Sequence, residues 1–235
     1  MNESSNIIIL HGWGLNGQKY EKLSQLLEKK GYKVFAPDFP GFGSEPLKSE
    51  SMDLGDYVEF LNNLIKKNKI SKPILIGHSF GGRVALRYGF ENPSKVSKLI
   101  LTGTPIIREK SFSKKIAYAG AVIGGRIFKK FPDIQKERIR KVLYFAIGEW
   151  DYYKAGSLKQ VFKNIIGEDL IKYIKEIKIP VFLIWGKNDK IVPAKYLKDI
   201  KKLNREVIYK TVPGVGHKLP YEKPEQFFEE IKSLI

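Results

Sequence analysis

The sequence predicts an α/β fold in which a mostly parallel, six-stranded sheet is flanked by helices. Short apolar runs alternate with amphipathic segments along the chain, and this alternation is typical of a parallel sheet covered by helices. The expected strands are residues 6–10, 32–36, 73–77, 96–103, 180–186 and 206–212. The expected helices are residues 17–30, 53–68, 80–92, 194–203 and 224–234.

One long interval interrupts this alternation. Residues 105–178 contain no β-type run of the expected kind, whereas residues 113–131 and 134–147 have helical patterns. An insertion that leaves after the fourth strand and returns to the fifth should lie over the carboxyl ends of the strands, where open α/β sheets bind ligands. We therefore expect a helical cap, or lid, at residues 105–178 on a core made of residues 1–104 and 179–235.

The composition is that of one globular unit. The chain has 235 residues, of which 43% are hydrophobic, and this is enough for one domain with a substantial core. The longest apolar stretch of low charge, from Ile116 to Phe128, is shorter than the roughly 20 residues that a membrane-spanning helix needs. No secretory leader is visible before Asn6, so the expected location is the cytoplasm. The absence of cysteine excludes disulfides, thiolate metal sites and a cysteine nucleophile.

The formal net charge of +17 raises the question of an acidic partner. Of the 42 basic residues, 35 are Lys and 7 are Arg, and the lysines are spread over the helical patterns. Nucleic-acid binding usually adds clustered Arg, aromatic stacking platforms or a recognisable module, and the sequence has no such arrangement. We therefore expect lysine-rich solvated faces and no nucleic-acid partner.

A candidate nucleophile lies in a turn between an expected strand and an expected helix. The turn reads Gly77-His-Ser-Phe-Gly-Gly, with Ser79 at its centre. A nucleophile held in a strained strand-to-helix turn needs small neighbours, and Gly77 and Gly81 remove the side chains that would collide. The motif alone is weak evidence, but its place between strand and helix favours Ser79 as a nucleophile.

A serine hydroxyl needs a base, and His217 is the leading candidate among three histidines. It follows the last expected strand, whose end lies at the same edge of the sheet as the other carboxyl ends. His11 and His78 flank glycines in two loops and are interpreted as scaffold or pocket residues. The competing interpretation of His217 is a histidine that merely fills a loop.

Asp189 is the expected partner of that base. It follows the apolar strand at residues 180–186, again at a carboxyl end, and a carboxylate there would hold the histidine tautomer and stabilise the imidazolium. The alternative is that Asp189 only caps the following helix. Asp38 precedes the serine in the chain and is interpreted as a brace for its own turn.

The developing oxyanion requires preorganised donors, and two backbone amides are available. The Phe80 amide follows the nucleophile, and the Trp13 amide belongs to the loop His11-Gly-Trp-Gly after the first expected strand. The side chains of Trp13 and Phe80 would then form walls of the acyl pocket. The alternative for the loop is an ordinary tight turn.

Five motifs now stand in an order typical of α/β-hydrolase fold proteins. They are His11-Gly-Trp-Gly, Pro37-Asp-Phe-Pro-Gly-Phe-Gly, Gly77-His-Ser-Phe-Gly-Gly, Trp185-Gly-Lys-Asn-Asp and Gly216-His. The chain resembles this family over nearly its whole length outside the cap, and the order nucleophile, acid, base is the family's own. Within the family it looks like capped carboxylesterases, including those that resemble pimeloyl-ester esterases of biotin synthesis, and like serine-dependent carbon–carbon bond hydrolases.

Two departures from the family pattern, and the identity of the residue at position 79, shape the expectations. The cap is the variable part of the family, so no residue role is carried over onto it. Family members usually carry one or two strands before the His-Gly loop, so the resemblance implies a sheet trimmed to six strands. A serine at position 79 argues against haloalkane dehalogenases and epoxide hydrolases, which resemble this pattern but have aspartate there.

The cap is expected to be basic on one face and aromatic inside. Residues 108–141 carry eleven basic side chains against three acidic ones, so contact with an anionic surface is one interpretation. In the competing interpretation, the lysines are solvated and the apolar face of the cap packs over the site. Tyr144, Phe145 and Trp150 are the expected substrate-binding residues of the cap, and they equally suit a small cap core.

The sequence as a whole predicts a serine hydrolase that cleaves a carboxylic ester of a small or medium acyl group through an acyl-enzyme on Ser79. No metal and no organic cofactor is needed for this chemistry. Thioester, amide or carbon–carbon bond hydrolysis at the same site is the first alternative. A non-hydrolytic ligand receptor on the same fold is the alternative from another class.

Overall fold

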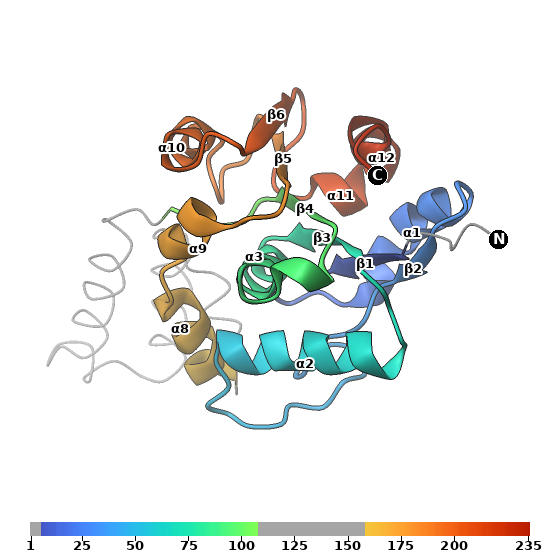
Figure 1. Cartoon of the computed structure of the whole chain (residues 1–235), viewed down its shortest axis with the longest axis vertical. Helices are drawn as coiled ribbons and strands as arrows, with labels where there is room; N and C mark the ends of the chain where they lie inside the picture. Colours follow the sequence, from blue (N-terminus) through green and yellow to red (C-terminus); the bar gives the residue numbers. More distant parts are fainter. Residues whose placement is uncertain (1–5, 108–157) are drawn as a thin grey trace, which may run out of the picture.

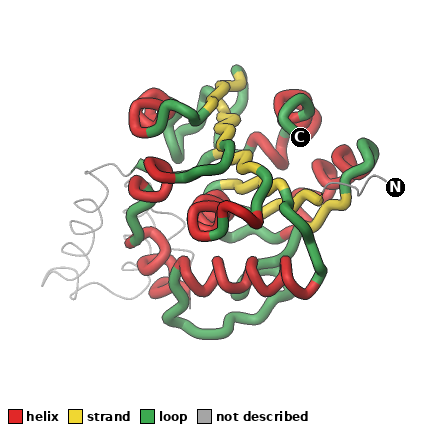
Figure 2. Tube along the Cα trace, viewed as in Figure 1, coloured by secondary structure: helices red, strands yellow, loops and turns green. Residues whose placement is uncertain are grey.

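The computed structural model describes residues 6–107 and 158–235, which form a three-layer α/β/α sandwich around one sheet (Figures 1 and 2). The sheet is parallel throughout and has the order β2-β1-β3-β4-β5-β6. Its strands are β1 Asn6–Leu10, β2 Lys33–Phe35, β3 Ile74–His78, β4 Lys98–Thr102, β5 Val181–Gly186 and β6 Ile208–Val212. The six expected strands and the parallel arrangement are confirmed.

The apolar side chains of the strands pack on both faces of the sheet. In β1, Ile8 and Leu10 belong to one buried cluster, whereas Ile7 and Ile9 belong to the other. Successive strand side chains point to opposite faces, so a strand that is covered on both sides must be apolar at every position. This explains why the central strands appear in the sequence as continuous apolar runs.

Helices cover the two faces unequally. The apolar side chains of α1, α11 and α12 join the cluster that contains Ile7, and those of α2, α3, α9 and α10 join the cluster that contains Ile8. Figure 1 shows the two groups on opposite sides of the sheet. The helices are α1 Glu21–Glu28, α2 Leu54–Lys67, α3 Phe80–Glu91, α8 Lys159–Gly167, α9 Ile171–Glu176, α10 Tyr196–Leu203, α11 Leu219–Glu222 and α12 Pro224–Ile231, with 3-10 turns η1 Gly17–Tyr20 and η2 Pro93–Lys95.

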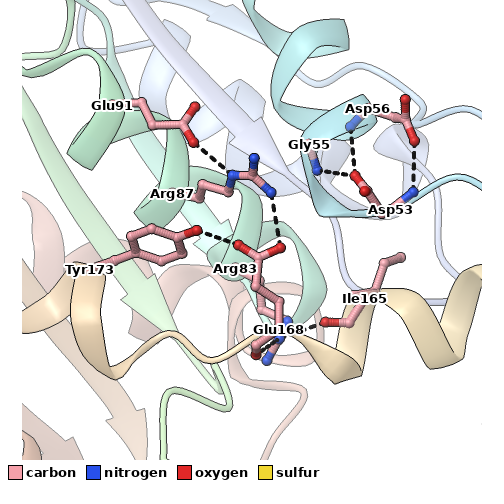
Figure 3. Close-up of polar contacts among 9 residues, drawn as sticks. All are labelled: Asp53, Gly55, Asp56, Arg83, Arg87, Glu91, Ile165, Glu168 and Tyr173. Carbon is pink, nitrogen blue, oxygen red and sulfur yellow. Dashed lines mark hydrogen bonds and ion pairs between the residues drawn. The ribbon is translucent and has the colours of Figure 1, made fainter.

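The longest described helix, α2, shows how the sequence sets its bounds. The Asp53 carboxylate accepts from the Gly55 and Asp56 amides, and the Asp56 carboxylate accepts from the Asp53 amide (Figure 3). This reciprocal capping box satisfies amides that the helix start leaves without partners. Asn68 ends the helix, so both bounds agree with the predicted segment to within one residue.

Two strand bounds differ from the predicted ones for local reasons. The fourth strand, predicted at residues 96–103, begins at Lys98 because the chain bends at Ser97, and it stops before Gly103, whose φ of +60° is incompatible with extended backbone. The second, predicted at residues 32–36, is limited to Lys33–Phe35 because only β1 pairs with it at the sheet edge.

The chain between β4 and β5 is the predicted insertion, and its described end is tied to α3 by Arg83. This buried guanidinium, 3% exposed, donates to the carbonyls of Pro105, Ile165 and Glu168. Pro105 lies just after β4, and Ile165 and Glu168 lie at the end of α8. One side chain on the helix that follows Ser79 therefore holds both ends of the insertion.

A second set of contacts surrounds the Glu168 carboxylate (Figure 3). One oxygen accepts from Arg87 at 2.9 Å and the other from the Tyr173 hydroxyl. Arg87 also pairs with Glu91 at 2.8 Å, so its guanidinium bridges two carboxylates. These groups are partly exposed, unlike Arg83, and each pair should therefore contribute less to stability.

We expect Arg83→Met to lower the free energy of unfolding by about 3 kcal/mol, because three carbonyls lose a charged donor in a buried place. Arg87→Met is the matched control on the same helix, and we expect a loss of at most about 1 kcal/mol. Urea denaturation of both variants measures the difference. Equal losses of unfolding free energy in the two variants would contradict the conclusion that Arg83 holds both ends of the insertion.

The predicted helices at 113–131 and 134–147 lie outside the described residues, as does the whole basic segment at 108–141. Within residues 6–107 and 158–235, no helix combines the length and apolar character needed to span a bilayer.

Candidate active site

Ser79 lies on a strained turn between β3 and α3. Its φ and ψ are 51° and −109°, a region that residues with a side chain rarely adopt. Its amide donates to the Thr102 carbonyl at 2.9 Å. A Cβ at Gly81 would lie 2.1 Å from the Leu10 carbonyl oxygen, and one at Gly77 would lie 2.6 Å from the Gly82 Cα. The packing thus explains the glycines on both sides of the serine.

Asp189 and His217 meet at the carboxyl ends of β5 and β6. The His217 Nδ1 lies 2.8 Å from Asp189 Oδ2, and the side chains are 11% and 1% exposed, respectively. A carboxylate oxygen only accepts, so Nδ1 carries the proton and Nε2 of the neutral ring is left with a lone pair. The pair therefore presents the tautomer that a general base requires.

The second oxygen of Asp189 is fixed by the backbone. Oδ1 accepts from the Ile191 amide at 2.9 Å and from the Val192 amide at 2.8 Å. The two interpretations of this residue are thus compatible: Asp189 closes the turn that leads toward α10, and its other oxygen holds the histidine.

The His217 ring lies beside the turn that carries Ser79. Its centroid is 4.9 Å from that of His78, the residue before the serine. A Cβ at Gly103, in the turn after β4, would lie 2.6 Å from His217 Cε1. Because β4 is the neighbour of β3 in the sheet, the candidate base His217 lies at the same edge as the candidate nucleophile.

The loops that carry Trp13 and Phe80 are joined at this edge. The Gly81 amide donates to the His11 carbonyl at 3.0 Å, and the Trp13 and Phe80 ring centroids lie 5.6 Å apart. Within residues 6–107 and 158–235, no hydrogen-bond acceptor takes the Trp13 or Phe80 amide. Two amide donors near the candidate nucleophile are the arrangement that an oxyanion hole needs.

An aromatic cluster surrounds the Trp13 ring. Trp13 makes edge contacts with Phe42 and Phe162, each at 4.9 Å between centroids. Phe42 comes from the turn after Phe39 and Phe162 from α8, so core and insertion both contribute. Sequence reasoning missed both residues, although the apolar spacing of α8 was a usable signal for Phe162. The predicted pocket residues Tyr144, Phe145 and Trp150 lie outside the described residues.

Comparison with known families agrees with this geometry. The family model described as alpha/beta hydrolase fold matches residues 6–122 and 125–224. The chain belongs to the α/β-hydrolase fold family. The match covers both the loop of Trp13 and the loop of His217, so the elements that build the candidate site all lie within it.

Individual relatives within the α/β-hydrolase family are named as esterases. The chain is 28% identical over 247 residues to a putative esterase/lipase 2 of Mycoplasma pneumoniae, which covers 98% of this chain and 88% of the relative. It is 30% identical over 258 residues to a pimeloyl-[acyl-carrier protein] methyl ester esterase of Wigglesworthia glossinidia brevipalpis, with 99% and 94% covered. A solved esterase from Exiguobacterium antarcticum has the same fold, with a TM-score of 0.73, 21% identity, and coverage of 100% of this chain and 92% of that one.

His11 and Asp38 brace the loops around this α/β-hydrolase site. His11 Nδ1 donates to the Gly12 carbonyl at 2.8 Å, and Nε2 accepts from the Phe39 amide at 2.9 Å. Asp38 accepts from the Gly17 amide and from both donors of Ser44. Burial raises the pKa of Asp38, but these hydrogen bonds outweigh it and leave the pKa below its usual value. Asp38 thus acts as the predicted brace of its turn.

We expect the folded chain to lose stability as the pH falls below about 6.5. Burial lowers the pKa of both His11 and His78 below the ordinary value of 6.5. Both are therefore neutral in the folded state but take up protons on unfolding. The stability that the two neutral histidines contribute is complete above pH 6.5. Below this pH, the free energy of unfolding falls by up to about 1.4 kcal/mol per pH unit for each histidine.

Thermal melts between pH 8 and pH 5 test this expectation. The Tm should be nearly level above pH 7 and fall by several degrees between pH 6 and pH 5. A Tm that does not change over the whole range would contradict the neutral, buried state of the two histidines.

Proposed function

We propose that this α/β hydrolase is a serine esterase that cleaves a carboxylic ester through an acyl-enzyme on Ser79. The observation that carries the proposal is the hydrogen bond between His217 Nδ1 and the buried Asp189 carboxylate, at 2.8 Å. It leaves Nε2 as the base at the sheet edge where Ser79 occupies its strained turn. Nucleophile, base and orienting acid are then Ser79, His217 and Asp189.

In the first step, His217 Nε2 takes the Ser79 hydroxyl proton as Oγ attacks the ester carbonyl carbon. The carbonyl oxygen becomes negative, and the Trp13 and Phe80 amides donate to it. The carbon–oxygen bond to the alcohol then breaks, and the alcohol takes the proton from Nε2. Asp189 stays ionised and stabilises the imidazolium that exists between these two transfers.

In the second step, water replaces the alcohol. His217 Nε2 takes one proton from the water as its oxygen attacks the acyl carbon, and the same two amides hold the oxyanion. The bond between the acyl carbon and Ser79 Oγ breaks, Oγ recovers the proton, and the carboxylic acid leaves. The cycle is balanced and needs no metal and no cofactor.

The walls of the proposed acyl site are aromatic. The Trp13 ring makes edge contacts with the rings of Phe42, Phe80 and Phe162, and such walls suit the apolar chain of a small or medium acyl group. The proposed cap, residues 105–178, would add Tyr144, Phe145 and Trp150 to them. The relative named as a methyl ester esterase makes monomethyl esters of dicarboxylic acids a further substrate class to assay.

A panel of p-nitrophenyl esters with two to twelve acyl carbons tests the proposal. We expect p-nitrophenol release with an optimum at short or medium chains, and an initial burst of one equivalent per chain if deacylation is slower. A matched panel of thioesters, anilides and a vinylogous β-diketone measures the competing bond types. Turnover of none of these while a ligand of the pocket still binds would contradict the enzyme and support a receptor.

The proposal places the protein in the cytoplasm with a small-molecule ester as its partner and no nucleic acid. Peripheral contact of the basic cap with an anionic surface is testable on vesicles of phosphatidylglycerol. Retention at low salt that Lys129→Gln with Lys130→Gln removes would support the contact, and absence of retention would contradict it.

A further inference from the structure

A chain of buried hydrogen bonds joins three loops of the proposed esterase site. The Gly12 amide lies 3.2 Å from the Tyr20 hydroxyl, which lies 2.6 Å from His78 Nδ1. His78 Nε2 in turn lies 3.0 Å from the His217 carbonyl oxygen. The chain therefore runs from the loop that carries Trp13, through the residue next to the nucleophile, to the backbone of the base.

The chemistry of the groups fixes the direction of this chain. An amide only donates and a carbonyl only accepts, so the Gly12 amide donates to Tyr20, and His78 Nε2 carries the proton that it donates to His217. The neutral imidazole then has a lone pair on Nδ1, which accepts the Tyr20 proton. All three bonds point the same way, and each group has one consistent role.

The surroundings of His78 keep its ring neutral and in place. The residue is 2% exposed, and burial together with the neighbouring His217 ring holds its pKa well below the ordinary value. The Tyr221 ring packs against it at 5.7 Å between centroids. A Cβ at Gly12 would lie 2.7 Å from His78 Nδ1, so the oxyanion loop and this imidazole are in direct contact.

We propose that Tyr20 and His78 are positioning residues that hold the oxyanion loop and the base loop in register across the nucleophile turn. This rests on the proposed function. The Gly12 amide and the Trp13 amide belong to successive peptide units, so fixing the first limits the rotation of the second. The His217 carbonyl is part of the residue that supplies the base, so fixing it limits the movement of the ring.

If the oxyanion loop and the base loop shift relative to one another, we expect the rate of hydrolysis to fall while substrate binding stays unchanged. The two loops come from β1 and β6, which lie on opposite sides of β3 in the sheet, and the His78 side chain contacts both. Small misplacement of an oxyanion donor or a base raises the barrier, because these contacts are complete only in the transition state. The aromatic walls of the acyl site are untouched.

The test is Tyr20→Phe, which removes one hydroxyl and keeps the ring. We expect kcat to fall about tenfold or more while KM changes less than twofold. The matched control is Tyr57→Phe, because Tyr57 is also fully buried and its hydroxyl also has a backbone partner, the Pro40 carbonyl at 3.1 Å. Both variants should lose similar stability, but the control should keep its kcat. Equal kcat in the two variants would overturn the proposal.

A second measurement does not depend on turnover. Long-range ¹H–¹⁵N spectra of histidine-labelled wild type should show His78 protonated at Nε2 and not at Nδ1 from pH 6 to pH 8, with His78→Gln identifying its signals. In Tyr20→Phe, His78 Nε2 should stay protonated because the His217 carbonyl still accepts from it, whereas the ¹⁵N shift of Nδ1 should change because that nitrogen loses its hydroxyl donor. A His78 that titrates in this range, or an Nδ1-protonated wild type, would overturn the proposal. Failure of the esterase proposal is distinguishable, because wild type itself would then show no turnover.

Discussion

Ser79→Ala is expected to abolish ester hydrolysis, with kcat lowered by about 10⁵-fold or more. The variant removes the only atom that forms the acyl bond, while His217, Asp189 and the amide donors stay in place. Substrate binding should survive, because the aromatic walls do not involve the hydroxyl. Steady-state hydrolysis with the preferred p-nitrophenyl ester, together with a ligand-binding titration, measures the two effects separately.

The same position offers a control on the strain of the turn. Ser79→Gly should also be inactive, but it should raise the free energy of unfolding by about 1 kcal/mol, because glycine adopts a φ of +51° without cost. Ser24→Gly in helix α1 makes the same chemical change in ordinary helical backbone and should destabilise by about 1 kcal/mol. Hydrolysis by either Ser79 variant near the wild-type rate would contradict its role as nucleophile.

Asp189→Asn is expected to lower kcat by about 10⁴-fold without unfolding the protein. The Ile191 and Val192 amides both donate to one oxygen of residue 189. An asparagine must keep its own oxygen there, so its NH₂ group faces His217 Nδ1. That nitrogen must then accept, which moves the ring proton to Nε2 and leaves no lone pair for the nucleophile's proton.

Asp169→Asn is the matched control for this substitution. The Asp169 carboxylate also accepts from the amide two residues later, that of Ile171 at 2.9 Å, but at an exposed turn. Activity should therefore be unchanged in this variant. Stability and the pH dependence of kcat should be compared in both. A fall in kcat of less than tenfold in Asp189→Asn would show that the tautomer of His217 is not set by this carboxylate.

The central strands of the sheet were predictable from sequence because they are buried on both faces. A run such as Ile74–Ile76 has no room for a polar residue, and the turns after it need glycine or a cap. The meeting of Asp189 and His217 was predictable for a related reason: parallel strands bring their carboxyl ends to one edge, whatever the distance along the chain.

The contacts of Tyr20 and Arg83 were not predictable in the same way. Tyr20 reaches His78 across 58 positions, and nothing in its local pattern separates it from a core tyrosine. The sequence around Arg83 is typical of an exposed helix residue, yet the side chain donates to carbonyls that lie 22 or more residues away along the chain. The Gly12 amide and the carbonyls that Arg83 contacts are backbone groups, which leave no signature in the side-chain sequence, so contacts of this kind require the structure.

The most direct test of the account is the site of covalent labelling by a fluorophosphonate. The wild-type chain should gain one phosphonyl group per molecule, and peptide mass spectrometry should locate it on Ser79. Ser79→Ala should remain unlabelled under the same conditions. A folded wild-type chain that takes up no label, or a Ser79→Ala variant that is labelled equally well, would contradict the account.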